Sequence, residues 1–528
     1  MSEGGAGTDL RLVPAATVCW LASGVALGHG AQVVAAGGVL VLALGAALAV
    51  TGARCRTRCP TPAGRWRGTA VVALAAAAAA LISCASQIGA REGGALPRLV
   101  ADRAVVTVVG VVRAEVVRTE GRSGRYRTVL AVEQVVGRGR SSAAATAVLT
   151  RGGSQWHGTT YGTRVRTTGR LAPGRLGERT SATLVTWGEV ETVDPPGPVD
   201  ASVARLRTSL LEVTDPLPAD LRGLVPGAAI GDTSRIPESL GEAMRSVSLT
   251  HVTAVSGSHF AVLAVTVLAL TGCLRMPRAA RAAVSILALA GFVVLVHPEP
   301  SVVRAGVMGA VATSGLLLGR RSSAVPALMA AVITLLVVDP WLARSFGFAL
   351  SVLATAGIVL VAPHLAARMS TWLPGWLATA VAVPASAQLV CAPVVVLLDP
   401  VVSLGAIPAN LLAAPALVPA TLLGLAATLV APWWPDAATL LAWGAGGPAW
   451  WVAAVARAGA ALPGGRLDWP AGLPGLVALL AVHSAGAVAV LGAGRLARER
   501  RPGAMLVAAV LALALVPTVR SSLLGAVL

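Results

Sequence analysis

Residues 69–85 read TAVVALAAAAAALISCA, and this apolar stretch decides how the rest of the sequence is divided. Its length is close to the ~20 residues that a helix needs to cross a bilayer. Arginines at positions 54, 56, 58, 65 and 67 precede it, and such a cluster is typical of a cytoplasmic loop. The helix therefore carries the chain outward, and we expect the next ~110 residues to lie on the outer side of the membrane.

The composition excludes an ordinary soluble protein. Of the 528 residues, 55% are hydrophobic and only 12% are charged. About ten or eleven apolar runs are long enough to span a bilayer. Besides 69–85 these are residues 12–27, 33–50, 252–273, 282–297, 302–318, 324–338, 346–362, 377–398, 472–493 and 503–518, while prolines obscure the count between 401 and 456. The sequence predicts a polytopic α-helical membrane protein.

All 42 basic residues are arginines. A P-loop needs a lysine to reach the nucleotide phosphates, so this chain has none, and ATP hydrolysis would fall to another protein. Fourteen of the arginines lie in four short loops, 52–67, 275–281, 320–321 and 495–501, which we place in the cytoplasm. The loops at 297–301, 339–341 and 399–400 then fall outside.

Between residues 91 and 198 the composition changes to short β-rich runs separated by glycine-rich turns. The runs are residues 105–112, 127–136, 146–150, 163–171 and 183–193. Five strands at this spacing predict a small extracytoplasmic β-barrel of the OB kind, with a β-sandwich as the alternative. The predicted domains are therefore 1–88 (transmembrane helices), 91–198 (the β domain), 199–250 (a surface amphipathic helix and linker helices) and 251–528 (the main transmembrane domain).

The segment HVTAVSGSHF, residues 251–260, places His251 and His259 eight residues apart at the outer end of a predicted span. We expect them on one helical face, with Ser256 and Gly257 between them. Polar groups in a span are unfavourable unless they are partnered or wet. A helix break lining a water-filled path is one interpretation. Hydrogen bonding to neighbouring helices, with Gly257 allowing close packing, is the other.

A second polar set stands inside or at the edge of the spans. Its members are Arg304, Asp339, Arg344, Gln388 and Asn410. A charge at the depth of Arg304 is a functional candidate by default, with Asp339 or Asp399 as candidate partners. The alternative for Arg304 is an interfacial side chain that extends toward the headgroups.

The predicted β domain offers an external set of basic and aromatic residues: Arg125, Arg127, Trp156, Tyr161, Arg164, Arg166 and Arg170. A basic barrel with aromatic side chains is a common way to hold a single nucleic-acid strand. Ten acidic residues between 91 and 200 make a mixed, solvated face an equal alternative. Cys55 and Cys59 lack further ligands nearby, so we expect no metal and no cofactor.

Read in order, the motifs of the second transmembrane bundle and of the segment that leads into it resemble the ComEC family of competence DNA-uptake channels. The most specific is Gly231-Asp232 followed by Thr250-His251 and Ser256-Gly257-Ser258-His259. Further matches are 300–305 with Met308, Asp339-Pro340, 347–351, 354–357, Gln388 with Pro393, and 410–412 with Pro415. The β segment after three spans also suits this family, although residues 174–193 lack its Asn-Pro-Gly-x-Phe-Asp stretch.

The resemblance implies that single-stranded DNA crosses the bacterial cytoplasmic (inner) membrane through residues 251–528 during natural transformation. Implied partners are membrane lipid, a cytoplasmic ATP-driven motor, an extracytoplasmic DNA receptor and a separate nuclease. Family members usually continue into a nuclease domain with an H-x-H-x-D-H zinc cluster, a spacing that the seven histidines never take. We therefore expect a transport protein, not an enzyme, that translocates DNA without cleaving it.

Two other functions stay open. The first is transport of another polyanion or polymer on the same scaffold. The second is an intramembrane serine hydrolase, in which Ser256 is the nucleophile and His259 or His483 the base.

Overall fold

The structure, a computed structural model, describes residues 9–56, 63–119, 125–138, 140–174, 178–253, 255–298, 300–317, 324–462 and 465–492. The chain forms two compact units. The barrel unit comprises Val18–Thr208 and Leu335–Arg344. The helical unit comprises the residues up to Thr17, Ser209–Thr334 and the residues from Ser345 on.

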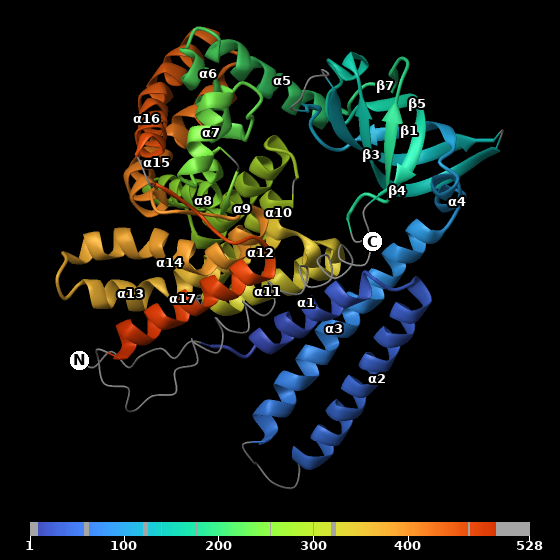
Figure 1. Cartoon of the computed structure of the whole chain (residues 1–528), viewed down its shortest axis with the longest axis horizontal. Coiled ribbons are helices and arrows are strands. Elements are labelled where there is room, and N and C mark those ends of the chain that lie inside the picture. Colours follow the sequence, from blue (N-terminus) through green and yellow to red (C-terminus); the bar gives the residue numbers. More distant parts are fainter. Residues whose placement is uncertain are drawn as a thin grey trace. The chain divides into compact units, whose positions relative to one another are not determined.

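The first helices are those predicted from the apolar runs: α1 (Val13–Ala26), α2 (Ala31–Arg56) and α3 (Ala63–Glu92), followed by the short α4 (Leu96–Ala101). Helices α2 and α3 lie side by side as an antiparallel hairpin (Figure 1). A Cβ added at Gly38 would lie 3.2 Å from the side chains of Leu81 and Ile82, and one at Gly45 3.2 Å from Leu74. Small residues thus allow these apolar helices to approach closely, as in membranes.

A closed five-stranded barrel follows. Its strands are β1 (Val105–Val112), β3 (Tyr126–Gly137), β4 (Arg140–Gly152), β5 (Arg164–Pro173) and β6 (Ala182–Thr186). The order is β1-β3-β4-β6-β5, and β5 pairs with β1 to close the barrel. Only β4 and β6 run parallel among these pairs. The closure of the sheet confirms the predicted β-barrel and excludes the alternative of a β-sandwich. Two short strands, β2 (Val117–Arg118) and β7 (Glu191–Asp194), pair with β3 and β5.

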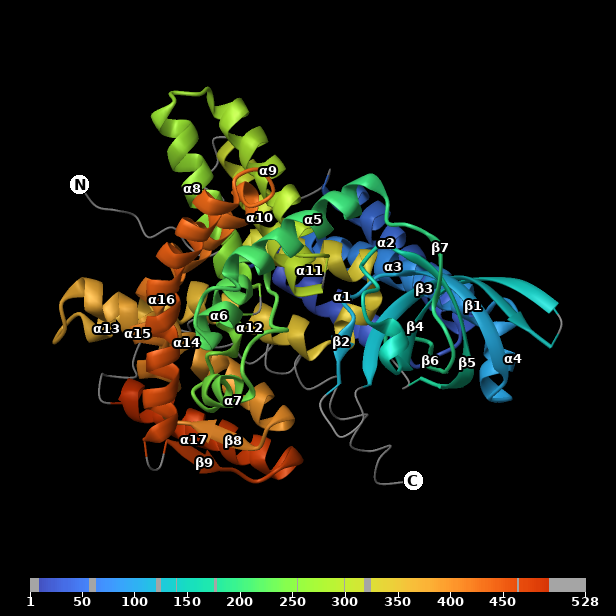
Figure 2. The same cartoon turned by 90° about the horizontal axis from the view of Figure 1, so that it is seen from above.

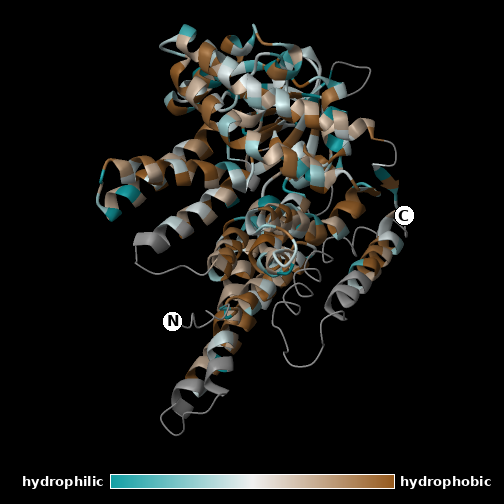
Figure 3. Cartoon of the chain, turned by 90° about the vertical axis from the view of Figure 1, so that its left-hand side faces the viewer, coloured by the Kyte–Doolittle hydropathy of each residue, from teal (hydrophilic) through white to brown (hydrophobic). Residues whose placement is uncertain are grey.

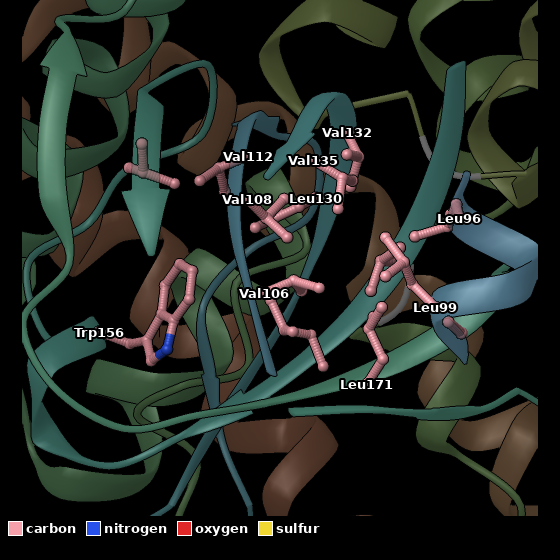
Figure 4. Packing of buried hydrophobic residues seen from close by; sticks show 14 residues of the cluster. Leu96, Leu99, Val106, Val108, Val112, Leu130, Val132, Val135, Trp156 and Leu171 are labelled. Carbon is pink, nitrogen blue, oxygen red and sulfur yellow. The ribbon is translucent and has the colours of Figure 1, made fainter. Parts of the chain in front are cut away.

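The barrel core follows from the alternation of apolar residues along each strand. Val106 and Val108 of β1, Leu130 of β3 and Leu171 of β5 are all buried in one cluster (Figure 4). The predicted run 183–193 divides into β6 and β7, because residues 187–190 leave the ladder between them. The other four predicted runs are confirmed as strands, and β4 is longer than expected.

Helix α5 (Pro198–Thr214) confirms the predicted helix at 199–214. The remaining helices are α6 (Ala219–Ile230), α7 (Glu238–Ser246), α8 (Gly257–Cys273), α9 (Arg278–Leu295), α10 (Pro300–Leu317), α11 (Ala324–Val338), α12 (Phe346–Leu360), α13 (Ala362–Met369), α14 (Gly375–Leu398), α15 (Ala406–Val430), α16 (Pro435–Ala461) and α17 (Gly472–Gly492). Helices α8, α9 and α10 pack against one another (Figure 2). The unclear region 401–456 contains the paired helices α15 and α16.

Hydrophobic residues dominate the helices (Figure 3). Among the described residues, six helices are long and apolar enough to cross a membrane, or seven if the bent pair α12–α13 counts as one span. This is fewer than the ten or eleven runs, because α1, α11 and parts of α10 and α17 form shorter apolar helices. The expected span 503–518 and the arginines at 320–321 and 495–501 lie outside the described residues. The chain is a multi-pass membrane protein.

Candidate functional site

The segment from Leu249 to Ser256 interrupts the helical unit. Helix α7 ends at Ser246, a 3-10 turn covers Thr250–Val252, and α8 begins only at Gly257. The prediction that His251 and His259 share one helical face is therefore wrong, because His251 belongs to the turn and His259 to α8. The structure shows a helix break between α7 and α8, and the water-filled path beside it stays a prediction.

Ser256 is the residue that starts α8. Its backbone is extended (φ −125°, ψ 173°), and its N–H donates to Nδ1 of His259 at 3.2 Å. Its Oγ lies 3.1 Å from the same Nδ1 and 2.7 Å from Oγ of Ser258. This is a capping box in which histidine takes the place of the usual glutamate. The short polar residues around position 256 thus explain why the helix breaks here.

The end of α6 fixes the other side of the break. Gly231 closes α6 in the left-handed conformation (φ +75°), where glycine is favoured. A Cβ at Gly231 would lie 3.0 Å from the Val255 side chain. The next residue, Asp232, is buried and accepts hydrogen bonds from the N–H and Oγ of Ser234 at 3.0 and 2.5 Å. The Gly-Asp motif is therefore a chain reversal in which Gly231 packs against Val255.

His259 carries a buried hydrogen-bond donor. Its side chain is only 4% exposed. Because Nδ1 accepts from the Ser256 N–H, the neutral ring holds its proton on Nε2. Within the described residues, Nε2 has no hydrogen-bond partner, although the ring lies beside the backbone of Ala228. His251 differs: it is exposed, and its Nδ1 lies 3.0 Å from the Ser248 carbonyl.

Arg304 is another buried donor of the helical unit. It lies in α10, is 3% exposed, and donates through Nη1 to the Gly347 carbonyl at 3.2 Å. Its guanidinium carbon is 5.7 Å from the centre of the Phe348 ring. In the described part of the helical unit Nε has no partner, and Arg304 forms no ion pair there. Its burial in protein argues against the interfacial alternative.

The two candidate partners of Arg304 contact other arginines. Asp339 belongs to the barrel unit, where its carboxylate lies 3.7 Å from Nε of Arg179. Asp399, in the helical unit, lies 4.0 Å from Arg466. Within the helical unit, Arg304 contacts the Gly347 carbonyl and the Phe348 ring of α12 instead of Asp399, whereas an ion pair with Asp339 stays a prediction.

Asp339 and Arg344 belong to a segment that is tied down within the barrel unit. Arg344 donates to the Gly24 carbonyl at 2.8 and 3.1 Å. Ser83 and Gln87 of α3 donate to the carbonyls of Val337 and Val338. The guanidinium of Arg91 lies 3.5 Å above the Trp341 ring, a contact that the sequence did not reveal. These contacts give Asp339 and Arg344 a structural role in this unit.

The other two polar candidates lie within α14 and α15. Gln388 is half-buried. Asn410 donates to the Ala406 carbonyl one turn earlier at 2.8 Å, so its amide is partly satisfied by its own helix. The structure records no contact that joins either side chain to His259 or Arg304.

On the barrel, the structure corrects the expected aromatic platform. Trp156 is 1% exposed, belongs to the core cluster, and donates from Nε1 to Oγ1 of Thr186 at 2.9 Å (Figure 4). It cannot stack on a base, because closure of the barrel places the 154–156 turn over the core. Tyr161 is half-exposed, and the Arg113 guanidinium lies 5.9 Å from its ring centre.

Two of the expected arginines are neutralised. Arg164 contacts Glu133 and Asp194, both at 2.9 Å, and Arg166 contacts Glu191 at 2.9 Å. The hydrogen bond to Asp194, with the charge of Glu133, raises the pKa of Arg164. Arg125, Arg127 and Arg170 are exposed. For Arg164 and Arg166 the mixed charged face is thus what the structure shows.

Together these features define a class: a multi-pass α-helical membrane protein with a small closed β-barrel and a broken helix bearing buried polar side chains. Residues 229–496 match the competence protein family, and the chain belongs to this family. The matched region contains the break and Arg304. Family membership indicates a role in competence.

One curated relative supports this assignment. Over 159 residues the chain is 28% identical to ComE operon protein 3 of Bacillus subtilis (strain 168). The aligned segment covers 30% of this chain and 20% of that protein. No solved structure gives a significant match.

Proposed function

We propose that this protein forms the conduit through which single-stranded DNA crosses the bacterial cytoplasmic membrane during natural transformation. The observation that carries the proposal concerns two of the buried N–H groups that have no hydrogen-bond partner among the described residues of the helical unit, Nε2 of His259 and Nε of Arg304. Buried polar groups are normally paired, so unpaired ones indicate that something polar binds beside them.

The chemistry of these donors suits a phosphate chain. Removing an ion of this size from water costs several kcal/mol, so a DNA strand needs a hydrated path lined by polar groups. An N–H donor is complementary to a water oxygen or a phosphate oxygen. The helix break is flanked by the exposed residues His251 and Ser258. We assign His251, Ser256, Gly257, His259 and Arg304 to the path, with Gln388 and Asn410 as further candidates.

The barrel supports an external role. Its strand order, with the third and fifth strands of the closed barrel parallel, supports an OB-like fold, a kind of barrel that binds single strands. We place it on the outer side of the membrane, where a DNA receptor would deliver the strand. Because the sequence has no lysine and hence no P-loop, pulling requires a cytoplasmic ATP-driven motor.

The test is uptake of fluorescently labelled DNA by cells carrying Arg304→Gln. Glutamine keeps a donor for the Gly347 carbonyl but removes the charge. Losing a charge-assisted contact of about 1.5–3 kcal/mol predicts a drop of roughly ten- to hundredfold. Arg466→Gln, an exposed arginine with the same charge change, is the control and should leave uptake near normal. Normal uptake in Arg304→Gln at a normal membrane level would remove Arg304 from the path.

One contact favours the serine hydrolase. Oγ of Ser256 lies 3.1 Å from Nδ1 of His259, within reach for a nucleophile and base. However, Nδ1 already accepts the Ser256 N–H as part of the helix cap, which reduces its availability as a base. Labelling with a fluorophosphonate decides: a catalytic Ser256 reacts and Ser256→Ala does not, whereas absence of labelling supports the conduit. A competition assay tests the alternative substrate. If polyphosphate or another polyanion suppresses the uptake of labelled DNA but unlabelled DNA does not, the protein transports a polyanion other than DNA.

A further inference from the structure

The strand register brings three arginines into one row on the outside of the barrel. Arg127 of β3 is the direct partner of Arg151 in β4. Arg151 pairs with Val185 of β6, and Val185 pairs with Arg170 of β5. Directly paired residues point to the same side of a sheet. All four residues are exposed, so this row lies on the outer surface.

Trp187 extends the row along the chain direction of β6. Buried and outward residues alternate through 182–187, which places Trp187 on the same side as Val185. Its N–H donates to the Thr168 carbonyl of β5 at 3.4 Å, so it follows the edge of that strand. The side chain is 46% exposed, in contrast to Trp156. An accessible indole therefore lies next to the arginine row.

The charges of this row are free, unlike those elsewhere on β5. Arg164 and Arg166 are held by Glu133, Asp194 and Glu191. Within the described residues, Arg127, Arg151 and Arg170 form no ion pair or side-chain hydrogen bond. Glu189 is the acidic residue nearest to Trp187 along the chain, and its single negative charge is smaller than the three positive charges of the arginines. The row keeps a net positive charge that an anion can use.

We propose that Arg127, Arg151 and Arg170 with Trp187, here called the basic ridge, form the surface on which the barrel holds a single nucleic-acid strand. The inference rests on the proposed function and replaces the set around Trp156, Arg164 and Arg166. Strands lie about 4.8 Å apart, so the ridge spans about 14 Å from β3 to β5. The arginines contact phosphates and Trp187 stacks on a base, a combination that holds single strands with little sequence preference.

The test measures binding of a fluorescein-labelled oligothymidine by anisotropy. The full-length protein is used in nanodiscs of zwitterionic lipid, and the salt concentration is varied. The ridge variant Arg151→Gln/Arg170→Gln is compared with Arg164→Gln/Arg166→Gln, which removes the same number of arginines from the barrel. The ridge variant should bind on the order of tenfold more weakly, and its salt slope should fall by about 1.4, since each phosphate contact contributes about 0.7. The control should stay within about twofold of the wild type.

A second variant separates stacking from charge. Trp187→Leu should weaken binding by about tenfold without changing the salt slope, because stacking releases no counterions. Trp187→Phe should restore most of the affinity. This difference between the two kinds of variant is specific to a strand that contacts both groups.

Three results would overturn the ridge. In the first, the ridge variant binds DNA as tightly as the wild type. In the second, the control loses as much affinity as the ridge variant, which would show that only the net charge matters. The ridge variants could also keep DNA binding but lose hydrogen-exchange protection in nanodiscs of anionic lipid, which would make the ridge a lipid contact. The path is judged separately by the uptake of Arg304→Gln, so normal uptake there together with weakened ridge binding would remove Arg304 from the path and leave the ridge.

Discussion

The two ring nitrogens of His259 have different environments, and this asymmetry connects the local fold to the proposed path. Nδ1 faces the N–H and Oγ of Ser256, which start α8. This contact fixes the ring and leaves the Nε2 proton in the protein interior without a partner among the described residues. A single capping residue thus both breaks the helix and orients a donor.

Substitution of Ser256 should therefore destabilise the start of α8. Ser256→Ala removes the hydroxyl beside Nδ1 and should lower the free energy of unfolding by about 1 kcal/mol, the usual effect of losing a cap. Ser256→Thr keeps the hydroxyl and should retain most of the stability. Thermal unfolding of the purified protein in detergent checks both variants. If alanine is as stable as serine while threonine is not, the hydroxyl does not cap α8.

At the scale of the element, the reversal between α6 and α7 positions the break. Gly231 holds the left-handed turn, and its neighbours Thr253 and Val255 pack against the end of α6. The geometry of the break thus depends on Gly231, which lies 18 positions before Leu249, where the break begins.

Gly231→Ala should be destabilising for two reasons. A left-handed backbone costs a non-glycine residue roughly 1–2 kcal/mol, and the new methyl group would lie 3.0 Å from Val255. Gly241→Ala in α7 is the matched control, because nothing lies within 4 Å of its added Cβ. There alanine should be neutral or stabilise by about 0.5–1 kcal/mol. Melting temperatures of the two variants test the contrast, and equal shifts would contradict it.

The elements also show what local sequence can and cannot predict. The alternation of valines identifies β1 directly, and apolar length identifies α2 and α14, because each pattern depends on neighbours along the chain. The burial of Trp156 and the neutralisation of Arg164 depend on strands that meet only when the barrel closes. The basic ridge has the same origin: Arg151 lies one residue beyond the predicted strand 146–150, and its alignment with Arg170 exists only through β6.

At the scale of the whole molecule, the question is which ends of the helices face outward. Within the barrel unit, Arg91 at the end of α3 stacks on Trp341 and donates to the Glu178 carbonyl of the barrel at 3.0 Å. Arg179 of the same barrel loop contacts Asp339. The end of α3 near Arg91, the barrel and residues 339–344 thus lie close together within the barrel unit. This agrees with the expectation, drawn from the arginine loops, that they lie on one side of the membrane.

The same reasoning extends along the helical unit and gives a prediction about its turns. If α14, α15 and α16 each cross the membrane, residues 399–405 and 465–471 share one side, expected to be the outer side, and the pairing of β8 (Val401–Ser403) with β9 (Arg466–Asp468) requires them to share a side. The turn with the exposed Trp433 and Trp434 then lies in the cytoplasmic interface, where tryptophan is enriched.

Cysteine labelling in intact spheroplasts tests this arrangement. In a variant lacking the six native cysteines, Val105→Cys and Leu404→Cys should react with a membrane-impermeant maleimide, because both positions are exposed and expected outside. Trp434→Cys should react only after permeabilisation. Labelling of position 434 in intact cells, or protection of 404, would reverse the assignment of these turns.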